Sequence, residues 1–156
     1  MRNIDGNYSA LYRIAMSIGD SSDLIPMLDK SLRVFNHELS LEGSGVLFYK
    51  VESDKGLSLD PVLYVPDDET LSAVFHEAFM RTDAICNSKT LNDVEGRLPF
   101  REKLLDDVSL YAYSLPYIGV LMLLRQGDSF SELIDNEITK LAGKLSFACS
   151  ACLRRS

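Results

Sequence analysis

The chain has 156 residues, 46% hydrophobic and 25% charged, which is enough apolar sequence for one globular domain with a buried core. Its net charge of −7 and its scattered basic residues argue against nucleic acid and anionic membranes as direct partners, because both need a concentrated positive patch. With no apolar run near the roughly 20 residues of a membrane helix, no signal-peptide pattern and only three cysteines, we expect a single cytoplasmic domain spanning residues 1–156.

Two helices are expected ahead of the first strand. Apolar residues recur at helical spacing between Tyr8 and Ile18, and Gly19 is placed to end that helix. The polar run 20–23 offers N-caps for a second helix. The apolar face of this second helix consists of Leu24, Leu28, Leu32 and Phe35.

Two strands and a third helix follow. Residues 44–52 and 57–65 are predicted to pair as a hairpin linked through 54–56. Asp67 and Asp68 can cap a helix with one apolar face, made of Leu71, Val74, Phe75, Ala78 and Phe79. Residues 82–107 have no regular pattern. Within them we expect a short strand near 84–86 and a helical turn near 101–105.

The C-terminal third predicts a second hairpin, 108–115 with 117–125, and a long helix from about Ser131 to Leu153. The uninterrupted apolar run from Ile118 to Leu124 excludes a half-exposed strand, so something must cover both of its faces. We therefore predict an α+β domain with a central antiparallel sheet of five to six strands. The N- and C-terminal helices should lie on one face of that sheet, and the 67–107 segment should cover a pocket on the other.

The same residues resemble a GAF domain. Residues 109–115 are similar to the strand that precedes the family's Gly-Val-Leu strand, and Ile118-Gly119-Val120-Leu121 stands where the family has its signature glycine. Phe130-Ser131-Glu132 resembles the family's helix opening, the segment 141–145 its helix interior, and residues 23–32 its second helix. Ser114 departs from the family's usual Pro, and the hairpin link is shorter than usual. PAS domains are related in architecture, but the helix pair before the first strand and the long last helix favour GAF.

This resemblance implies a non-catalytic sensory domain of a signal-transduction protein, such as a sensor histidine kinase or a cyclase. In that family, the helix and loops on one sheet face enclose a small-molecule pocket, and the terminal helices on the other face form a homodimer. An output domain such as a kinase or cyclase would be attached if the chain is part of a longer protein. Two alternatives stay open: a stand-alone free methionine sulfoxide reductase, and a dimerisation module without a ligand.

Aromatic side chains in and around residues 67–107 predict where the pocket lies. The candidate pocket residues are Phe75, Phe79, Cys86, Phe100, Tyr111 and Tyr113. The alternative is a plain core, because aromatic residues at helical spacing more often pack inside a domain. The ligand and any cofactor stay unknown, and His76 as a haem ligand stays open.

Catalysis by Cys86 is not expected, because no activating base is evident and the other two cysteines lie far along the chain. A covalent bilin would need a His beside the Cys, but Cys86 is followed by Asn87. Cyclic nucleotide binding is not supported either, because the spacing from Phe100 to the acidic pair 106–107 does not match the family signature.

The last helix carries an a/d pattern typical of a coiled-coil seam. The predicted homodimer interface consists of Leu11, Ile134, Ile138, Leu141, Leu145, Ala148 and Cys152. A second apolar stripe includes Leu133, Phe147 and Ala151, so this helix is apolar over more than one face. An exposed stripe of this length would favour aggregation, which is why we expect a partner to cover it. In the alternative, the domain's own sheet and helices absorb both stripes and the chain is a monomer.

Overall fold

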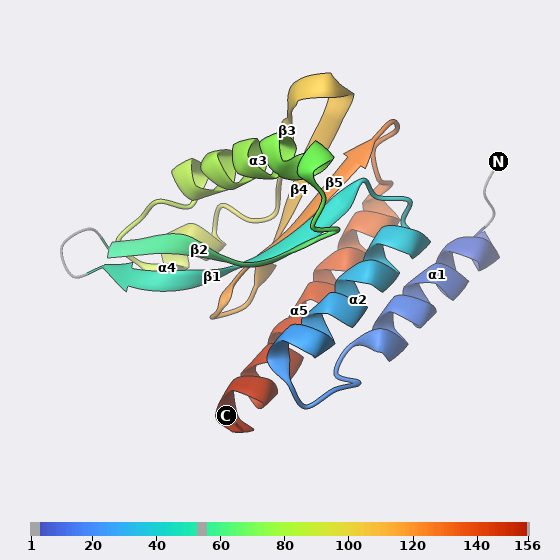
Figure 1. Ribbon diagram of the computed structural model, residues 1–156, viewed down its shortest axis with the longest axis horizontal. Helices are drawn as coiled ribbons and strands as arrows, with labels where there is room; N and C mark the ends of the chain where they lie inside the picture. The colour runs from blue at the N-terminus through green and yellow to red at the C-terminus, as the bar shows by residue number, and fades with distance from the viewer. Residues whose placement is uncertain (1–3, 53–55, 156) are drawn as a thin grey trace.

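The computed structural model describes residues 4–52 and 56–155 (Figure 1). Five strands form one antiparallel sheet in the order β2-β1-β5-β4-β3. The strands are β1 (Gly43–Glu52), β2 (Gly56–Val65), β3 (Phe100–Lys103), β4 (Val108–Leu115) and β5 (Gly119–Gln126). The predicted α+β class and the antiparallel five-stranded sheet are confirmed, while part of the predicted 54–56 hairpin link falls outside the described residues.

Three helices lie on one face of the sheet (Figure 1). They are α1 (Ile4–Ser17), α2 (Leu24–Glu38) and α5 (Glu132–Arg155). Gly19 follows α1 with a φ of 82°, a left-handed conformation that suits glycine and ends the helix. Ser131 lies just before α5 and caps it, because its Oγ accepts a hydrogen bond from the Ile134 amide at 3.2 Å.

The other face carries α3 (Ser72–Ile85) and the short α4 (Leu91–Glu95). A 3₁₀ turn, η1 (Glu69–Leu71), precedes α3, and Asp68 caps it by accepting from the Thr70 amide at 2.9 Å. Thr90 caps α4 in the same way through the Asp93 amide. A second 3₁₀ turn, η2 (Leu105–Asp107), leads into β4.

Within residues 82–107, two of the predictions are wrong. The expected strand near 84–86 is the C-terminal end of α3, and the expected helical turn near 101–105 is largely strand β3. Phe100 and Lys103 pair with Ala112 and Ser109 of β4, so ladder hydrogen bonds override the local helical preference of this charged segment. Sheet pairing is a long-range contact, and local sequence gives little sign of it.

The sheet separates two apolar cores. On β4 and β5, residues alternate strictly between them, as the two-residue period of a strand requires. Leu110, Ala112, Val120, Met122 and Leu124 face α3 and α4. Tyr111, Tyr113, Leu115, Leu121 and Leu123 face the three-helix layer. Burial on both faces explains the uninterrupted apolar run that the sequence shows.

Within the described residues, no helix combines the length and the apolar character that crossing a bilayer requires.

Gly119 is the position where the sheet tolerates no side chain. A Cβ built there would lie 1.9 Å from the Leu47 carbonyl oxygen, an atom of the neighbouring strand's backbone. We predict that Gly119→Ala lowers the free energy of unfolding by about 1–3 kcal/mol, the usual cost of overpacking. Gly143 on α5 is the matched control, since its Cβ would meet nothing within 4 Å. Gly143→Ala should stabilise the protein by roughly 0.5–1 kcal/mol through helix propensity. Urea unfolding measures both, and equal stability of the two variants would contradict the packing.

Candidate functional site

The space directly beneath α3 is core. Cys86, predicted to line a pocket, is 2% exposed and packs in the same cluster as Val94, Val120 and Met122. Thr82 of α3 lies against the sheet here, because its hydroxyl is 3.5 Å from the Met122 sulfur of β5. The same hydroxyl donates to the Ala78 carbonyl within α3 at 2.8 Å. Any ligand space on this side must therefore lie at the margin of α3.

The six predicted pocket residues do not form one site. Tyr111 and Tyr113 lie on the opposite face of the sheet, in the core of the terminal helices, and that part of the prediction is corrected. The physical reason is the two-residue period of β4, which places these odd-numbered positions away from α3. The prediction failed because both faces are apolar, so the sequence pattern does not show which face a residue takes.

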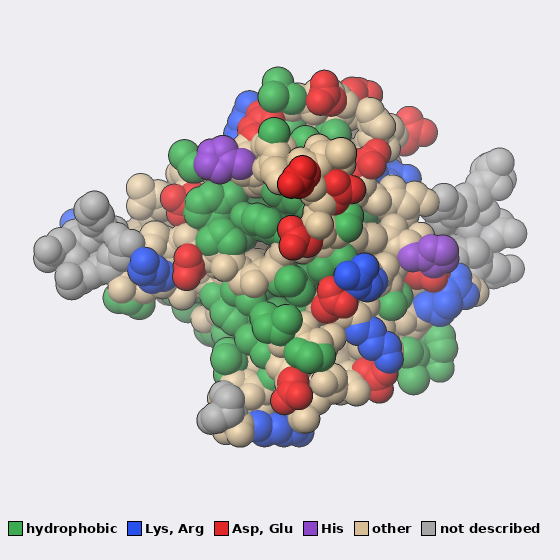
Figure 2. All heavy atoms as spheres, in the orientation of Figure 1, with side chains coloured by type: hydrophobic (Ala, Val, Ile, Leu, Met, Phe, Trp, Pro, Cys, Tyr) green, Lys and Arg blue, Asp and Glu red, His purple; other side chains and the backbone are tan. Residues whose placement is uncertain are grey.

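Phe75 and Phe79 do line a hollow, of about 420 Å³, between the N-terminal half of α3 and the end of β2. We call it the α3 groove. Its apolar wall consists of Pro61, Tyr64, Pro66, Phe75 and Phe79, and its polar rim of Asp67, Asp68, Ser72 and His76. Figure 2 shows this wall as hydrophobic surface between α3 and β2, with a histidine and acidic side chains beside it. Sequence reasoning missed Pro61, Tyr64 and Pro66.

Two glycines of β1 create the floor of the α3 groove. A Cβ at Gly45 would lie 2.7 Å from the Tyr64 ring, and one at Gly43 would lie 2.8 Å from the Phe75 ring. Because both side chains are absent, the two rings lie over β1 and stack on each other, with centroids 4.5 Å apart and planes 9° from parallel. The Gly-Ser-Gly sequence at 43–45 was the one signal that could have located this site.

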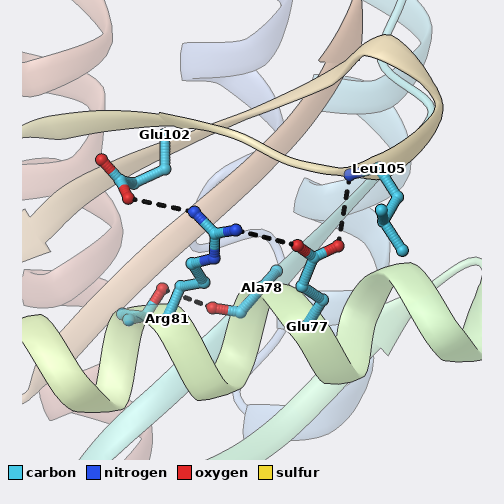
Figure 3. Close-up of polar contacts among 6 residues, drawn as sticks. Glu77, Ala78, Arg81, Glu102 and Leu105 are labelled. Carbon is cyan, nitrogen blue, oxygen red and sulfur yellow. Dashed lines mark hydrogen bonds and ion pairs between the residues drawn. The ribbon is translucent and has the colours of Figure 1, made fainter.

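The C-terminal half of α3 is fixed to both sheet edges. Arg81 pairs with Glu102 of β3 at 3.3 Å and with Glu77 of α3 at 3.2 Å, and Glu77 also accepts from the Leu105 amide (Figure 3). Toward β2, Asp83 accepts from the Leu59 amide at 3.1 Å. Exposed pairs of this kind contribute little stability each, but together they set the orientation of α3. The groove opens where these contacts end.

A second hollow, of about 380 Å³, lies on the other face, beside the N-terminal turn of α5. We call it the α5 hollow, and it is lined by Pro99, Phe100, Arg101, Tyr111, Phe130, Glu132 and Asp135. Tyr111, a predicted pocket residue, thus lies here and not with Phe75 and Phe79. Phe100 also lines this hollow, at the edge strand β3, but it packs against the core on the α3 face together with Phe75 and Phe79. Tyr113 is buried next to it and donates to Asp135 at 2.6 Å.

Comparison with known proteins shows the fold. The structure matches the crystal structure of the GAF domain from an Acinetobacter phosphoenolpyruvate-protein phosphotransferase, with a TM-score of 0.56 and 18% sequence identity. The match covers 100% of this chain and 98% of that one. The chain has a GAF-like fold. No protein-family model and no curated protein matches the sequence, so the likeness extends to architecture only.

The predicted dimer residues of this GAF-like domain lie inside it. Ile138 and Leu145 are fully buried, and Leu11, Ile134, Leu141 and Cys152 are at most 8% exposed in the core that α5 forms with the sheet and α1–α2. Ala148 packs against the same core. The prediction that this a/d stripe is a dimer interface is wrong, because the a/d residues of α5 pack against the sheet and helices of the same chain. All of these side chains except Ala148, which is partly buried, are therefore covered by the domain itself.

Cys86 and Cys149 of the GAF-like domain are poor nucleophiles. Burial raises the pKa of Cys86 to about 11 and that of Cys149 to about 12, so both are protonated thiols at neutral pH. Cys149 and Cys152 have the C-x-x-C spacing, but both lie within α5, on the opposite side of the sheet from Cys86. No resolving partner is therefore placed beside Cys86.

His76 lies on the rim of the α3 groove, and the described residues contain no group of three or more His, Cys, Asp or Glu that could hold a metal ion.

We predict that all three thiols resist modification in the folded protein, because all three are buried and the reagent cannot reach them. Ellman's reagent at pH 8 should react only as fast as the protein opens, whereas in guanidinium chloride it should release one equivalent of chromophore per cysteine at once. The denatured sample is the control. Fast reaction of Cys86 in the native protein would contradict the burial and would revive a reductase role.

Proposed function

We propose that this GAF-like domain is a non-catalytic sensory module that binds a small molecule in the α3 groove and pairs with a second copy through its terminal helices. The α3 groove is the observation that carries the proposal. Its volume and its mixture of an aromatic wall with a few polar rim groups are typical of small-molecule sites.

The ligand best suited to this groove is small, flat and mainly apolar. The stacked rings of Tyr64 and Phe75 form an aromatic part of the groove wall. Burial raises the pKa of Tyr64 to about 12, so its hydroxyl stays a neutral donor. Asp67 and Asp68 on the rim disfavour an anionic ligand. A polar hydrogen on the ligand can be accepted by those carboxylates.

An alternative role as a free methionine sulfoxide reductase receives no support from the thiols. A reductase needs an accessible, activated cysteine and a second thiol to resolve the oxidised form, whereas Cys86 is buried with a raised pKa.

The surface available to a second copy is the outer face of α1 and α5. Tyr12 and Met16 on α1 are 66% and 61% exposed, and Phe147 on α5 is 71% exposed. Lys144 Nζ donates to the Ala15 carbonyl at 2.8 Å, which brings the turns that carry Met16 and Phe147 side by side. Exposed apolar side chains gathered on one face favour association with a partner. This proposed interface replaces the buried a/d stripe.

Ligand binding can be tested with indole as a flat apolar probe in a two-dimensional NMR titration. We expect amide shifts at Ser72, His76 and Tyr64, and an affinity weakened by about five- to tenfold in Phe79→Ala, since an aromatic contact contributes roughly 1 kcal/mol. Met80→Ala is the matched control, because Met80 is exposed on the same helix and does not line the groove. Shifts located elsewhere, or equal losses in both variants, would contradict the proposal.

Dimerisation can be tested by light scattering coupled to gel filtration. At roughly 50 µM, well above a micromolar dissociation constant, we expect twice the chain mass of 17.4 kDa. Phe147→Glu should reduce the mass to that of one chain, because it places a charge in the apolar face. Met80→Glu, an equally polar change on α3, should leave the dimer intact. A wild-type mass of one chain would rule out this part of the proposal.

A further inference from the structure

The α5 hollow exists because the helical layer stops one strand short of the sheet edge. Helix α5 packs on β4, whereas β3 is the last strand and lies beyond it. The floor is aromatic: the rings of Tyr111 and Phe130 meet at a tilt, with centroids 4.7 Å apart. This leaves an apolar recess between β3 and the first turn of α5.

Opposite charges stand on the two sides of this recess. Arg101 projects from β3, and Glu132 and Asp135 come from the first turn of α5. Among the described residues, no ion pair joins Arg101 to either carboxylate. A guanidinium and two carboxylates line one hollow and do not neutralise each other.

Neighbouring groups hold these charges in place. The Tyr113 hydroxyl donates to Asp135 Oδ1 at 2.6 Å from beneath, and Arg101 Nη1 donates to the Ser129 hydroxyl. Arg125 lies over the Phe130 ring, 4.9 Å from its centroid, and helps to hold that ring in place. A site whose polar groups are already oriented loses less entropy when it binds a ligand.

We propose that the α5 hollow binds a small zwitterion: an α-amino acid with an apolar or aromatic side chain. The ligand carboxylate would pair with Arg101, the guanidinium geometry suiting a two-point contact. The ammonium group would face Glu132 and Asp135, and the side chain would lie against Tyr111 and Phe130. A simple anion would meet two carboxylates, and a simple cation would meet Arg101, so only a ligand with both charges satisfies the recess.

This site is distinct from the α3 groove, because the sheet separates the two. A test of this inference is therefore independent of whether a ligand binds in the α3 groove.

Isothermal titration calorimetry with L-phenylalanine and L-leucine tests this inference. We expect at least one of these amino acids to bind. We also expect the two analogues that lack one charge, 3-phenylpropionate and phenethylamine, to bind at least about tenfold more weakly than L-phenylalanine. Arg101→Met should weaken L-phenylalanine binding by about the same factor, since it removes the carboxylate partner. Lys103→Met is the matched control: it removes a positive charge from the same strand at a residue that does not line the hollow.

Glu132→Gln removes a second charge without touching the hydrogen bond between Tyr113 and Asp135, and it should weaken binding of the amino acid but not of 3-phenylpropionate. The inference is overturned if neither amino acid binds at up to about 10 mM, far weaker than an ordinary site. It is also overturned if the single-charge analogues bind as well as L-phenylalanine, or if Arg101→Met and Lys103→Met have equal effects. Indole shifts in the α3 groove should be unchanged in Arg101→Met.

Discussion

The hairpin of β4 and β5 is the constraint on which the rest of the structure depends. Nearly every side chain of these two strands is buried, and successive residues point to opposite faces. Exposing either face to water would cost about 25 cal/mol for each Å² of apolar surface. The chain must therefore supply a layer on each side: the terminal helices on one, and α3 with α4 on the other. Gly119 starts β5 against the backbone of β1 and admits no side chain, because a Cβ there would lie 1.9 Å from the Leu47 carbonyl oxygen.

Two-sided packing also decides where ligands can bind. The centre of the sheet is filled by aliphatic residues such as Leu47, Leu121 and Met122, all fully buried. Hollows remain near the two sheet edges, one between β2 and the N-terminal half of α3 and the other between β3 and the first turn of α5. The two have different chemistry, because the α3 groove is aromatic with an acidic rim and the α5 hollow has opposed charges. Under our proposals, the domain receives two unlike ligands on opposite faces of one sheet.

The positions of the two hollows also suggest how a signal could travel. The α5 hollow takes Glu132 and Asp135 from the first turn of the longest helix, and that helix ends at the C-terminal end of the described chain. Asp135 connects through the Tyr113 hydroxyl to the strand that also forms the core beneath α3. Under our proposal, a ligand there acts directly on the element that carries the outer apolar face.

Sequence patterns predicted the helices and strands far better than they predicted which face of the sheet each side chain takes. Helices α1, α2, α3 and α5 follow from apolar periodicity, and β4 and β5 from their continuous apolar runs. The predicted caps are less accurate: Asp23 makes no side-chain cap hydrogen bond to α2, and Asp68 caps the turn η1 that precedes α3. Strand β3 was not foreseen, since its charged sequence forms a strand only through pairing with β4. The predicted pocket wrongly combined residues from both faces of the sheet. Because β4 is apolar on both faces, its sequence does not show toward which face Tyr111 points. Likewise, the a/d stripe on α5 has the same spacing whether a second chain or the domain's own sheet covers it.

The central claim is that the two apolar layers are filled and that ligand space lies at their margins. Xenon enters dry apolar voids, so NMR spectra recorded under xenon pressure test this claim directly. We predict that amide shifts concentrate at the α3 groove, near Ser72 and His76, and are small at Ala112, Val120 and Met122. Large shifts at these three central positions, with none at the groove, would show an enclosed cavity beneath α3 and would contradict the account.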